Sequence, residues 1–352
     1  MPILCGRPWA HVVAVAFAAT CAALPAHAET IFQPHATWHE LSAAGRFFSE
    51  GVVAGKDGRL YITDMTPSVV FKENNPGGTI YRYDPKTKQL DTIMQPSGMA
   101  NGLHIDKRGD LIIAQTADTP ATGGRAIVRR NLATGAATLL ADSYDGKRLV
   151  GPNDVTSDAQ GHIYFTDARY GGNEPMELPN AVYRVDPNGK IVQLSTDVFR
   201  PNGIEVSPDG RRLYVAAFNS TRLRTNPSGP ATDKFGLIMG GVVAYDLDSA
   251  GNISNGRLFY RNDELGVDGM TLDTDGNLYL ALHNGSPQDP KGHVAVLDRN
   301  GKEIVRMDLP EKFIPSNLGF GRGADAGTLY MTTAFKWRLY SIPTTRHGHY
   351  FD

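Results

Sequence analysis

A motif of strand, Asp/Gly turn and strand recurs six times along the chain, and this repetition restricts the possible folds more than any other feature. In each copy a short alternating strand precedes the turn, and a second strand rich in Leu, Tyr, Ile and Val follows it. The starts of successive copies are separated by 51, 52, 49, 66 and 49 residues. The copies are "EGVVAGKDGRLYITD" from Glu50, "NGLHIDKRGDLIIAQ" from Asn101, "NDVTSDAQGHIYFTD" from Asn153, "NGIEVSPDGRRLYVAA" from Asn202, "DGMTLDTDGNLYLAL" from Asp268 and a degenerate "NLGFGRGADAGTLYMTT" from Asn317.

Two further strands follow the motif in each unit, as in "GGTIYRYDPKTKQLDTI" (77–93) and "AVYRVDPNGKIVQLS" (181–195), again with a turn at Asp-Pro. Four antiparallel strands repeated six times predict an all-β fold, a six-bladed β-propeller with four-stranded antiparallel blades. The stretch "HATWHELS" (35–42) precedes the first copy. We expect it to supply the outer strand of the last blade and so to close the ring.

The first residue of each copy is expected at one mouth of the central channel, because the first strand of each propeller blade lines that channel. All six of these residues carry a side-chain oxygen: Glu50, Asn101, Asn153, Asn202, Asp268 and Asn317. Asn and Asp also precede strands because their side chains satisfy local backbone groups, and such capping is the alternative interpretation. Capping does not explain Glu50, a poor turn former. Hard oxygen donors without His or Cys instead predict a central metal site for Ca²⁺ or a similar hard cation.

The connections between the second and third strands are expected on the same side as this ring. Several are long and rich in Gly, Pro or Asn, and they span 64–78, 115–126, 167–180, 218–240 and 283–292. Long loops gathered over one mouth are typical of a binding pocket.

A few other residues are candidates for chemistry. Arg148 is a candidate partner for a substrate carboxylate, with a solvated surface charge as the alternative, and His104 and His283 are candidates for proton transfer. The chain has no G-x-S-x-G or H-E-x-x-H motif, which argues against a serine hydrolase or a zinc peptidase. The final "HGHYFD" (347–352) is expected to be a frayed tail.

The N-terminal segment has the pattern of a secretory signal peptide. Arg7 precedes an apolar stretch over 11–24, and the triplet Ala-His-Ala ends at residue 28. We expect cleavage of 1–28, which leaves 29–352 as a single propeller domain in the periplasm or the medium. A membrane anchor is the alternative, but the apolar run is short for a span of about 20 residues.

Cysteine content and charge exclude several classes of function. Cys5 and Cys21 both lie inside the predicted signal peptide, so the mature chain would have neither a disulfide nor a catalytic thiolate. The formal net charge of −2 offers no basic excess for binding nucleic acid. We expect a small-molecule partner, no nucleic acid, and no membrane contact after signal cleavage.

Four ordered motifs resemble the family of senescence marker protein (regucalcin), gluconolactonase and luciferin-regenerating enzyme. They are "SEGVVAGKDGRLYITD", "YDGKRLVGPNDVTSDAQGHIYFTD", "RPNGIEVSPDGRRLYV" and "GVDGMTLDTDGNLYLA". The resemblance extends over about 35–342 and is strongest to the bacterial gluconolactonase branch. It implies a six-bladed propeller with one divalent cation in the central channel. The ligands that it implies are Glu50, Asn153 of "PND", Asn202 of "PNG" and Asp268 of "DGM", while Asn101 would face the substrate and Asn317 would be structural.

The chain departs from this branch at three places. Val52 and Ala54 replace a proline and an aromatic residue, Val150 and Gly151 replace a polar pair, and Gln115 and Thr116 replace an acidic-His pair. The implied ligands are unaffected, but these changes argue against recognition of a polyhydroxylated sugar lactone.

The resulting hypothesis is a metal-dependent hydrolase that opens a lactone. A divalent cation, Ca²⁺ with Zn²⁺, Mn²⁺ and Mg²⁺ as alternatives, would polarise the carbonyl and activate a water. Asp268 is the candidate general base, with a metal-bound water acting alone as the alternative. Two rival functions remain open: an aryl esterase or phosphotriesterase that uses the same metal site, and a non-catalytic ligand-binding propeller.

Overall fold

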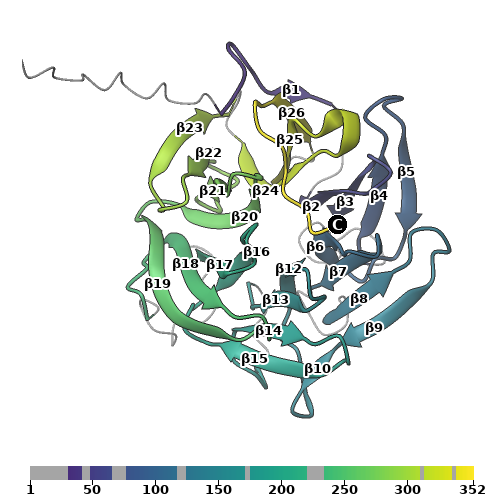
Figure 1. Cartoon of the computed structure of the whole chain (residues 1–352), viewed down its shortest axis with the longest axis vertical. Helices are drawn as coiled ribbons and strands as arrows, with labels where there is room; N and C mark the ends of the chain where they lie inside the picture. Colours follow the sequence, from purple (N-terminus) through teal and green to yellow (C-terminus); the bar gives the residue numbers. More distant parts are fainter. Residues whose placement is uncertain are drawn as a thin grey trace, which may run out of the picture. The chain divides into compact units, whose positions relative to one another are not determined.

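The computed structural model describes residues 31–41, 48–65, 77–116, 124–170, 175–219, 234–309, 313–334 and 338–352. These belong to one compact unit, Ile31–Asp352, in which six four-stranded antiparallel sheets follow one another around a central axis (Figure 1). The predicted six-bladed propeller is therefore confirmed. The predicted signal peptide, 1–28, lies outside the described residues. Within the described ranges, no helix has the length and apolar character needed to cross a membrane.

Blades one to three follow the predicted repeats. The first has β2 (Ser49–Ala54), β3 (Leu60–Asp64), β4 (Thr79–Tyr83) and β5 (Leu90–Met94). The second has β6 (Ala100–Ile105), β7 (Leu111–Gln115), β8 (Ala126–Arg130) and β9 (Ala137–Ala141). A hairpin of β10 (Ser143–Tyr144) and β11 (Lys147–Arg148) leads to the third, with β12 (Pro152–Ser157), β13 (Ile163–Asp167), β14 (Ala181–Val185) and β15 (Ile191–Ser195).

Blades four to six complete the ring. The fourth has β16 (Pro201–Val206), β17 (Arg212–Phe218), β18 (Gly240–Leu247) and β19 (Ile253–Asn262). The fifth has β20 (Gly266–Leu272), β21 (Leu278–His283), β22 (Gly292–Leu297) and β23 (Glu303–Asp308). The sixth has β24 (Ile314–Phe320), β25 (Thr328–Ala334), β26 (Leu339–Pro343) and β1 (His39–Glu40), with a short 3₁₀ turn, η2 (Gly323–Asp325), between its first two strands.

The ring is closed by the N-terminal strand of the unit. Strand β1 pairs with β26, with His39 opposite Ser341 and Glu40 opposite Tyr340, so the prediction that 35–42 closes the last blade is confirmed. The inner strands β2, β6, β12, β16, β20 and β24 contact one another in circular order, β24 returning to β2. Apolar side chains of adjacent sheets form the core between blades, such as Tyr214 of β17 with Leu280 of β21.

The recurring Asp/Gly turn is explained by its hydrogen bonds. In the third copy the Asp158 carboxylate accepts the His162 backbone N–H at 2.9 Å and the Tyr164 hydroxyl at 2.8 Å. Gly161 has φ +90°, a conformation that residues with a side chain rarely adopt. The fifth copy repeats this arrangement around Asp273. These two turns therefore stabilise their own hairpins from local sequence alone.

Every inner strand is interrupted by a bulge near its start. In β2, Ser49 pairs with Asp64 and Val52 with Ile62, so two residues are left out of the ladder. A bulge of this kind re-aims the side chains that it contains. The bulged pairs are Glu50–Gly51, Asn101–Gly102, Asn153–Asp154, Asn202–Gly203, Asp268–Gly269 and Ser316–Asn317.

This register corrects one prediction about the ring. Asn317 was expected at the first position, but Ser316 occupies it and Asn317 holds the second. The Ser316 hydroxyl donates to the Ser49 carbonyl at 2.6 Å. The sixth blade therefore supplies neither a carboxylate nor an amide at the first position.

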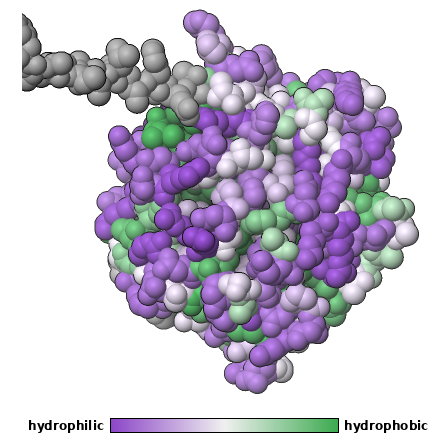
Figure 2. Space-filling model, in the orientation of Figure 1, coloured by the Kyte–Doolittle hydropathy of each residue, from purple (hydrophilic) through white to green (hydrophobic). Residues whose placement is uncertain are grey.

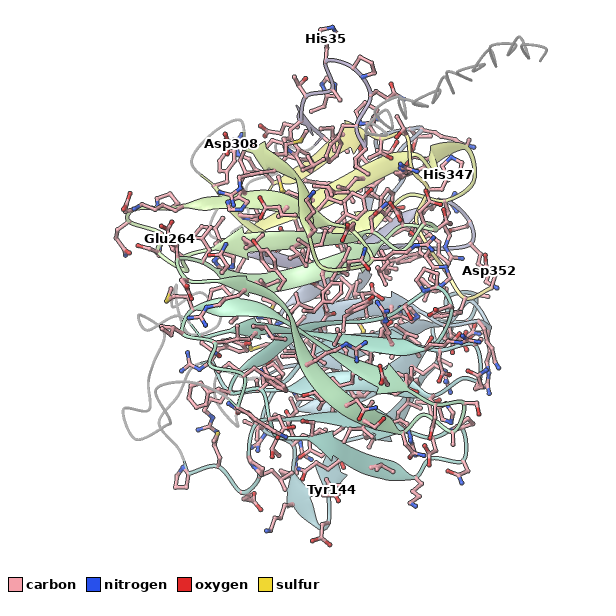
Figure 3. The ribbon with its side chains drawn as sticks, turned by 60° about the vertical axis from the view of Figure 1, so that its left-hand side comes forward. His35, Tyr144, Glu264, Asp308, His347 and Asp352 are labelled. Carbon is pink, nitrogen blue, oxygen red and sulfur yellow. The ribbon has the colours of Figure 1, made fainter. Side chains whose placement is uncertain are left out.

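The C-terminal residues are packed, and the prediction of a frayed tail was wrong. The His349 N–H donates to the Leu272 carbonyl at 2.9 Å, and the guanidinium of Arg322 lies 3.7 Å from the centroid of the Tyr350 ring. Figure 1 shows the chain ending near the centre of the ring of blades. Asp352 lies on the side opposite Glu264 in Figure 3. The tail therefore crosses the channel mouth remote from the bulges, on a face that Figure 2 shows as largely hydrophilic.

Candidate active site and metal centre

Five of the six predicted ring residues occupy equivalent bulge positions at the same end of the inner strands. Each of these five side chains is at most 7 % exposed. They are Glu50 on β2, Asn101 on β6, Asn153 on β12, Asn202 on β16 and Asp268 on β20. The structure thus gathers two carboxylates and three carboxamides at one buried mouth of the channel.

Threonines of the second strands hold the main chain of the ring. Thr63 donates to the Asn101 carbonyl at 2.9 Å, and Thr166 donates to the Asn202 carbonyl at 2.7 Å. Thr332 makes the same bond to the Glu50 carbonyl. Each threonine belongs to the blade before the residue that it holds, so the bonds tie neighbouring blades together. Sequence reasoning missed this role, although "ITD", "FTD" and "MTT" occur at matching places in the copies.

The electrostatics of the ring favour a bound cation. Burial, and then the charges of Asp268 and Asp154, raise the pKa of Glu50 well above its usual range. Two carboxylates close together in a buried site are unfavourable unless a positive charge compensates them. A set of carboxylate and carboxamide oxygens suits a hard divalent cation. The residues present therefore fit such an ion, and Glu50, Asn153, Asn202 and Asp268 are the ones that could hold it.

Asp268 has a specific hydrogen-bond partner in His283. The Nε2 atom of His283 lies 2.7 Å from Asp268 Oδ2, and both side chains are buried. The Gly285 backbone N–H donates to His283 Nδ1 at 2.9 Å, so Nδ1 carries no proton. Nε2 therefore carries the proton and donates it to Asp268. This geometry makes His283 a donor that orients Asp268 and argues against the predicted proton transfer to its ring.

A tyrosine that the sequence analysis did not single out lies beside the ring. The Tyr170 hydroxyl donates to the Pro201 carbonyl at 3.2 Å and forms a hydrogen bond with the Asn202 side chain. Burial, and then the negative charge of Asp268, raise the pKa of Tyr170. This phenol is therefore a protonated neighbour of two ring residues.

Below the ring the channel is closed by a floor. Asp154 and Asn317 occupy the second bulge positions of blades three and six, and their side chains are hydrogen-bonded to each other. Glycine stands at this position in the other four blades. A Cβ on Gly102 would lie 2.1 Å from Asp154 Oδ1, and one on Gly269 would lie 2.2 Å from Asn317 Cγ. The glycines therefore leave the space that the Asp154–Asn317 pair fills.

A cavity of about 40 Å³ lies beneath this floor, and the C-terminal tail covers it. Its lining includes His104, Thr156, Glu205 and Tyr350. His104 is hydrogen-bonded to Ser157 at 2.8 Å, and burial and then Arg322 lower its pKa to about 4. His104 is thus separated from the ring by the floor, which argues against its predicted role in proton transfer.

Residues 121–335 match the family model described as SMP-30/Gluconolactonase/LRE-like region. The chain belongs to this family. The resemblance found in the four sequence motifs is thereby confirmed, and it now rests on more than half of the chain.

Individual relatives of the chain agree with this assignment. A gluconolactonase of Zymomonas mobilis is 28 % identical over 266 residues, which cover 70 % of this chain and 67 % of the relative. The pentonolactonase XacC of Haloferax volcanii is 29 % identical over 265 residues, 73 % of this chain and 74 % of the relative. The gluconolactonase XC5397 of Xanthomonas campestris superposes with a TM-score of 0.67 at 23 % identity, covering 90 % of this chain and 95 % of that one, which shows the shared fold.

The contacts that the structure gives Arg148, the other predicted substrate contact, are to residues outside the ring. It is exposed on β11, where its guanidinium pairs with Asp142 at 3.0 Å and donates to the Gly124 carbonyl at 3.2 Å. Its contact with a substrate stays a prediction.

The departures from the gluconolactonase branch lie largely in the core. Ala54 and Val150 are buried in apolar clusters, and the Gln115 side chain donates to the Ser97 carbonyl at 2.8 Å. The N–H groups of Val150 and Gly151 donate to the Asp167 carboxylate. Because the side chains of Ala54 and Val150 pack in the core, they do not report on the polarity of a substrate pocket.

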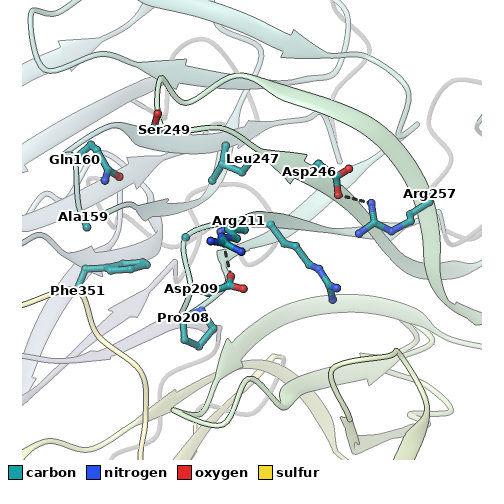
Figure 4. A pocket seen from close by; sticks show the side chains of 12 residues that line it. Ala159, Gln160, Pro208, Asp209, Arg211, Asp246, Leu247, Ser249, Arg257 and Phe351 are labelled. Atoms are coloured by element: carbon teal, nitrogen blue, oxygen red, sulfur yellow. Dashed lines mark hydrogen bonds and ion pairs between the residues drawn. The ribbon is translucent and has the colours of Figure 1, made fainter.

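A larger hollow of about 930 Å³ lies on the tail face (Figure 4). Among the residues that line it, Arg257 pairs with Asp246 at 2.7 Å, and Asp209 accepts the Ser207 hydroxyl at 2.6 Å. Its carboxylates are thus already bound by neighbouring side chains. None of the five ring residues lines this hollow, so the ring remains the candidate active site.

Proposed function

We propose that this protein is a metal-dependent lactonase, a hydrolase that opens a cyclic ester. The observation that carries the proposal is the pair of buried carboxylates, Glu50 and Asp268, set among the amides of Asn101, Asn153 and Asn202 at one channel mouth. Family membership supports the same conclusion, because the relatives from Zymomonas mobilis and Haloferax volcanii are named gluconolactonase and pentonolactonase.

In this proposal Glu50, Asn153, Asn202 and Asp268 hold one divalent cation, Ca²⁺ or alternatively Zn²⁺, Mn²⁺ or Mg²⁺. Such an ion, when bound, supplies Lewis-acid polarisation of a carbonyl oxygen and a lowered pKa of a bound water. Asn101, at the second blade's position in the ring, faces the substrate. Arg148 is the proposed partner of a substrate carboxylate.

Asp268 is the proposed general base. It takes a proton from the attacking water, whose oxygen forms a bond to the carbonyl carbon of the lactone. The ring C–O bond then breaks, and the proton passes to the departing alkoxide, so that the product is an open-chain hydroxy acid. The hydrogen bond from His283 Nε2 to Asp268 Oδ2 keeps the carboxylate oriented for this step.

The experiment is an assay of sugar lactones, aliphatic lactones, aryl esters and phosphotriesters, with and without chelator. We expect lactone opening that is lost with chelator and restored by added cation. Faster hydrolysis of aryl esters or phosphotriesters would favour the esterase or phosphotriesterase alternative, and no hydrolysis of any compound would favour a binding protein. Asp268→Asn should abolish turnover and leave the fold intact by circular dichroism; a wild-type rate would remove Asp268 from the role of base.

We further propose that 1–28 direct export to the periplasm or the medium. N-terminal sequencing of the protein recovered from these fractions should begin at Glu29. A mature chain that retains Met1 would contradict export by cleavage.

A further inference from the structure

We propose that Tyr170, Phe218 and His283, which we call the aromatic brace, orient the side-chain oxygens of Asn202 and Asp268 toward the centre of the ring. The inference rests on the proposed cation site and deepens it. The three brace residues act through Asn202 and Asp268, and they are therefore positioning residues.

His283 determines which oxygen of Asp268 is available. Its Nδ1 accepts the Gly285 N–H at 2.9 Å, so the Nε2–H donates to Asp268 Oδ2 at 2.7 Å. Oδ2 is engaged by this bond, which leaves Oδ1 for the ring. Because His283 is held from both nitrogens, its ring cannot turn without losing a buried hydrogen bond.

Tyr170 determines the orientation of the Asn202 amide. A phenol has one hydrogen to donate, and that of Tyr170 points to the main-chain carbonyls of Arg200 and Pro201, at 3.3 and 3.2 Å. In its hydrogen bond with the Asn202 side chain, the phenol oxygen must therefore accept. Only the amide nitrogen of Asn202 can donate that bond, so Oδ1 is turned away from Tyr170 and is available to the ring.

Phe218 packs between these two supports. Its ring centroid lies 6.3 Å from that of Tyr170, edge to face, and 4.6 Å from that of His283. Phe218 is 2 % exposed, and a Cβ on Gly266 would lie 2.4 Å from its Cδ2 atom. Glycine at 266 thus allows Phe218 to reach this place. The brace joins the loop after β13, the end of β17 and the end of β21 into one packed unit.

The physical benefit is preorganisation. An unsupported carboxamide can present either its oxygen or its nitrogen to a cation, and only the oxygen is a ligand. Supporting partners of metal ligands fix such orientations, and removing them lowers metal affinity about 10- to 100-fold. The brace gives this support to one ligand in blade four and one in blade five.

The test is calorimetric titration of chelator-treated protein with CaCl₂. Tyr170→Phe keeps the ring that packs on Phe218 and removes only the hydroxyl, and His283→Leu removes the donor to Asp268. We expect each change to raise the Kd for Ca²⁺ about 10- to 100-fold while the metal-free protein keeps its circular dichroism spectrum. His283→Gln restores an N–H donor near the Nε2 position and should recover most of the affinity.

Tyr164→Phe is the matched control, because it also removes a buried phenol hydroxyl, one that bonds Asp158 at the far end of blade three. It should lower thermal stability without changing the Kd. The proposed role of the aromatic brace would be overturned if the Kd of Tyr170→Phe for Ca²⁺ stayed within about threefold of the wild-type value. It would also be overturned if Tyr164→Phe weakened Ca²⁺ binding as much as Tyr170→Phe does. If His283→Leu fails to fold, the Kd of Tyr170→Phe for Ca²⁺ is sufficient to test the proposal. A wild-type protein that binds none of Ca²⁺, Mn²⁺, Zn²⁺ and Mg²⁺ would instead refute the proposed metal site itself.

Discussion

Glu205 offers a quantitative test of the closed cavity beneath the ring. It lies on β16 and accepts the Thr156 hydroxyl at 3.1 Å. Burial, and then the charge of Asp154, raise its pKa from 4.5 to about 8. The folded protein therefore binds this proton more tightly than the unfolded chain does. Replacement by the neutral isostere glutamine removes the difference and keeps the shape of the side chain.

The sign and the size of the effect follow from linkage. Below pH 4.5 the charge of Glu205 costs the wild-type protein no free energy of unfolding relative to the glutamine variant. The wild type loses stability relative to the variant as the pH rises from 4.5 to about 8, and the difference stays constant above that pH. A shift of about 3.5 units at about 1.36 kcal/mol each sets an upper bound near 5 kcal/mol. Glu205 keeps partial exposure to the cavity, so we halve this bound to about 2–3 kcal/mol.

Urea unfolding of the metal-free protein at about pH 5 and about pH 9 measures the effect. Glu205→Gln should exceed the wild-type free energy of unfolding by about 2–3 kcal/mol at the higher pH and by less than about 1 kcal/mol at the lower. Glu264→Gln, at an exposed carboxylate, is the control and should show no such dependence. The reasoning is refuted if the gain from Glu205→Gln is the same at both pH values.

Two further substitutions test the floor and the tail. Gly102→Ala should destabilise the fold by at least about 1–3 kcal/mol. The new Cβ would lie 2.6 Å from Asp154 Cα and 2.8 Å from the Asn153 carbonyl oxygen, and both are main-chain atoms that cannot easily move away. An unchanged melting temperature would contradict this close approach. Tyr350→Ala removes the ring beneath the Arg322 guanidinium and should cost about 1–3 kcal/mol. It should also speed exchange of the Thr274 amide, which follows β20 and donates to the His347 carbonyl of the tail at 2.9 Å. Unchanged exchange there would show that the tail does not protect the channel mouth.

The blades could be predicted from sequence because each repeat carries its own local signals. The Asp158 carboxylate and Gly161 define one turn without help from the rest of the chain. The closing strand was also predictable, since a ring of six copies needs a last outer strand. The sixth copy was misaligned by one residue because its asparagine stands at the second bulge position. Only the pairing of Pro315 with Thr333 and of Leu318 with Met331 reveals this register.

The candidate site was predictable only where the repeats supply it. Asn202 and Asp268 recur at fixed places in their copies, whereas Tyr170 and His283 come from the ends of other strands and meet them only in the folded ring. No periodicity marks such partners. The tail was misjudged for a similar reason, because it is held by main-chain bonds to β20, which is distant in sequence.

The most direct test of the account is a crystal structure of the protein with Mn²⁺, using anomalous scattering to locate the ion. The account predicts a single peak on the channel axis, within about 2.0–2.4 Å of an oxygen of each of Glu50, Asn153, Asn202 and Asp268. The account would be contradicted if no anomalous peak lay among these four residues and the protein hydrolysed lactones at full rate in the presence of chelator.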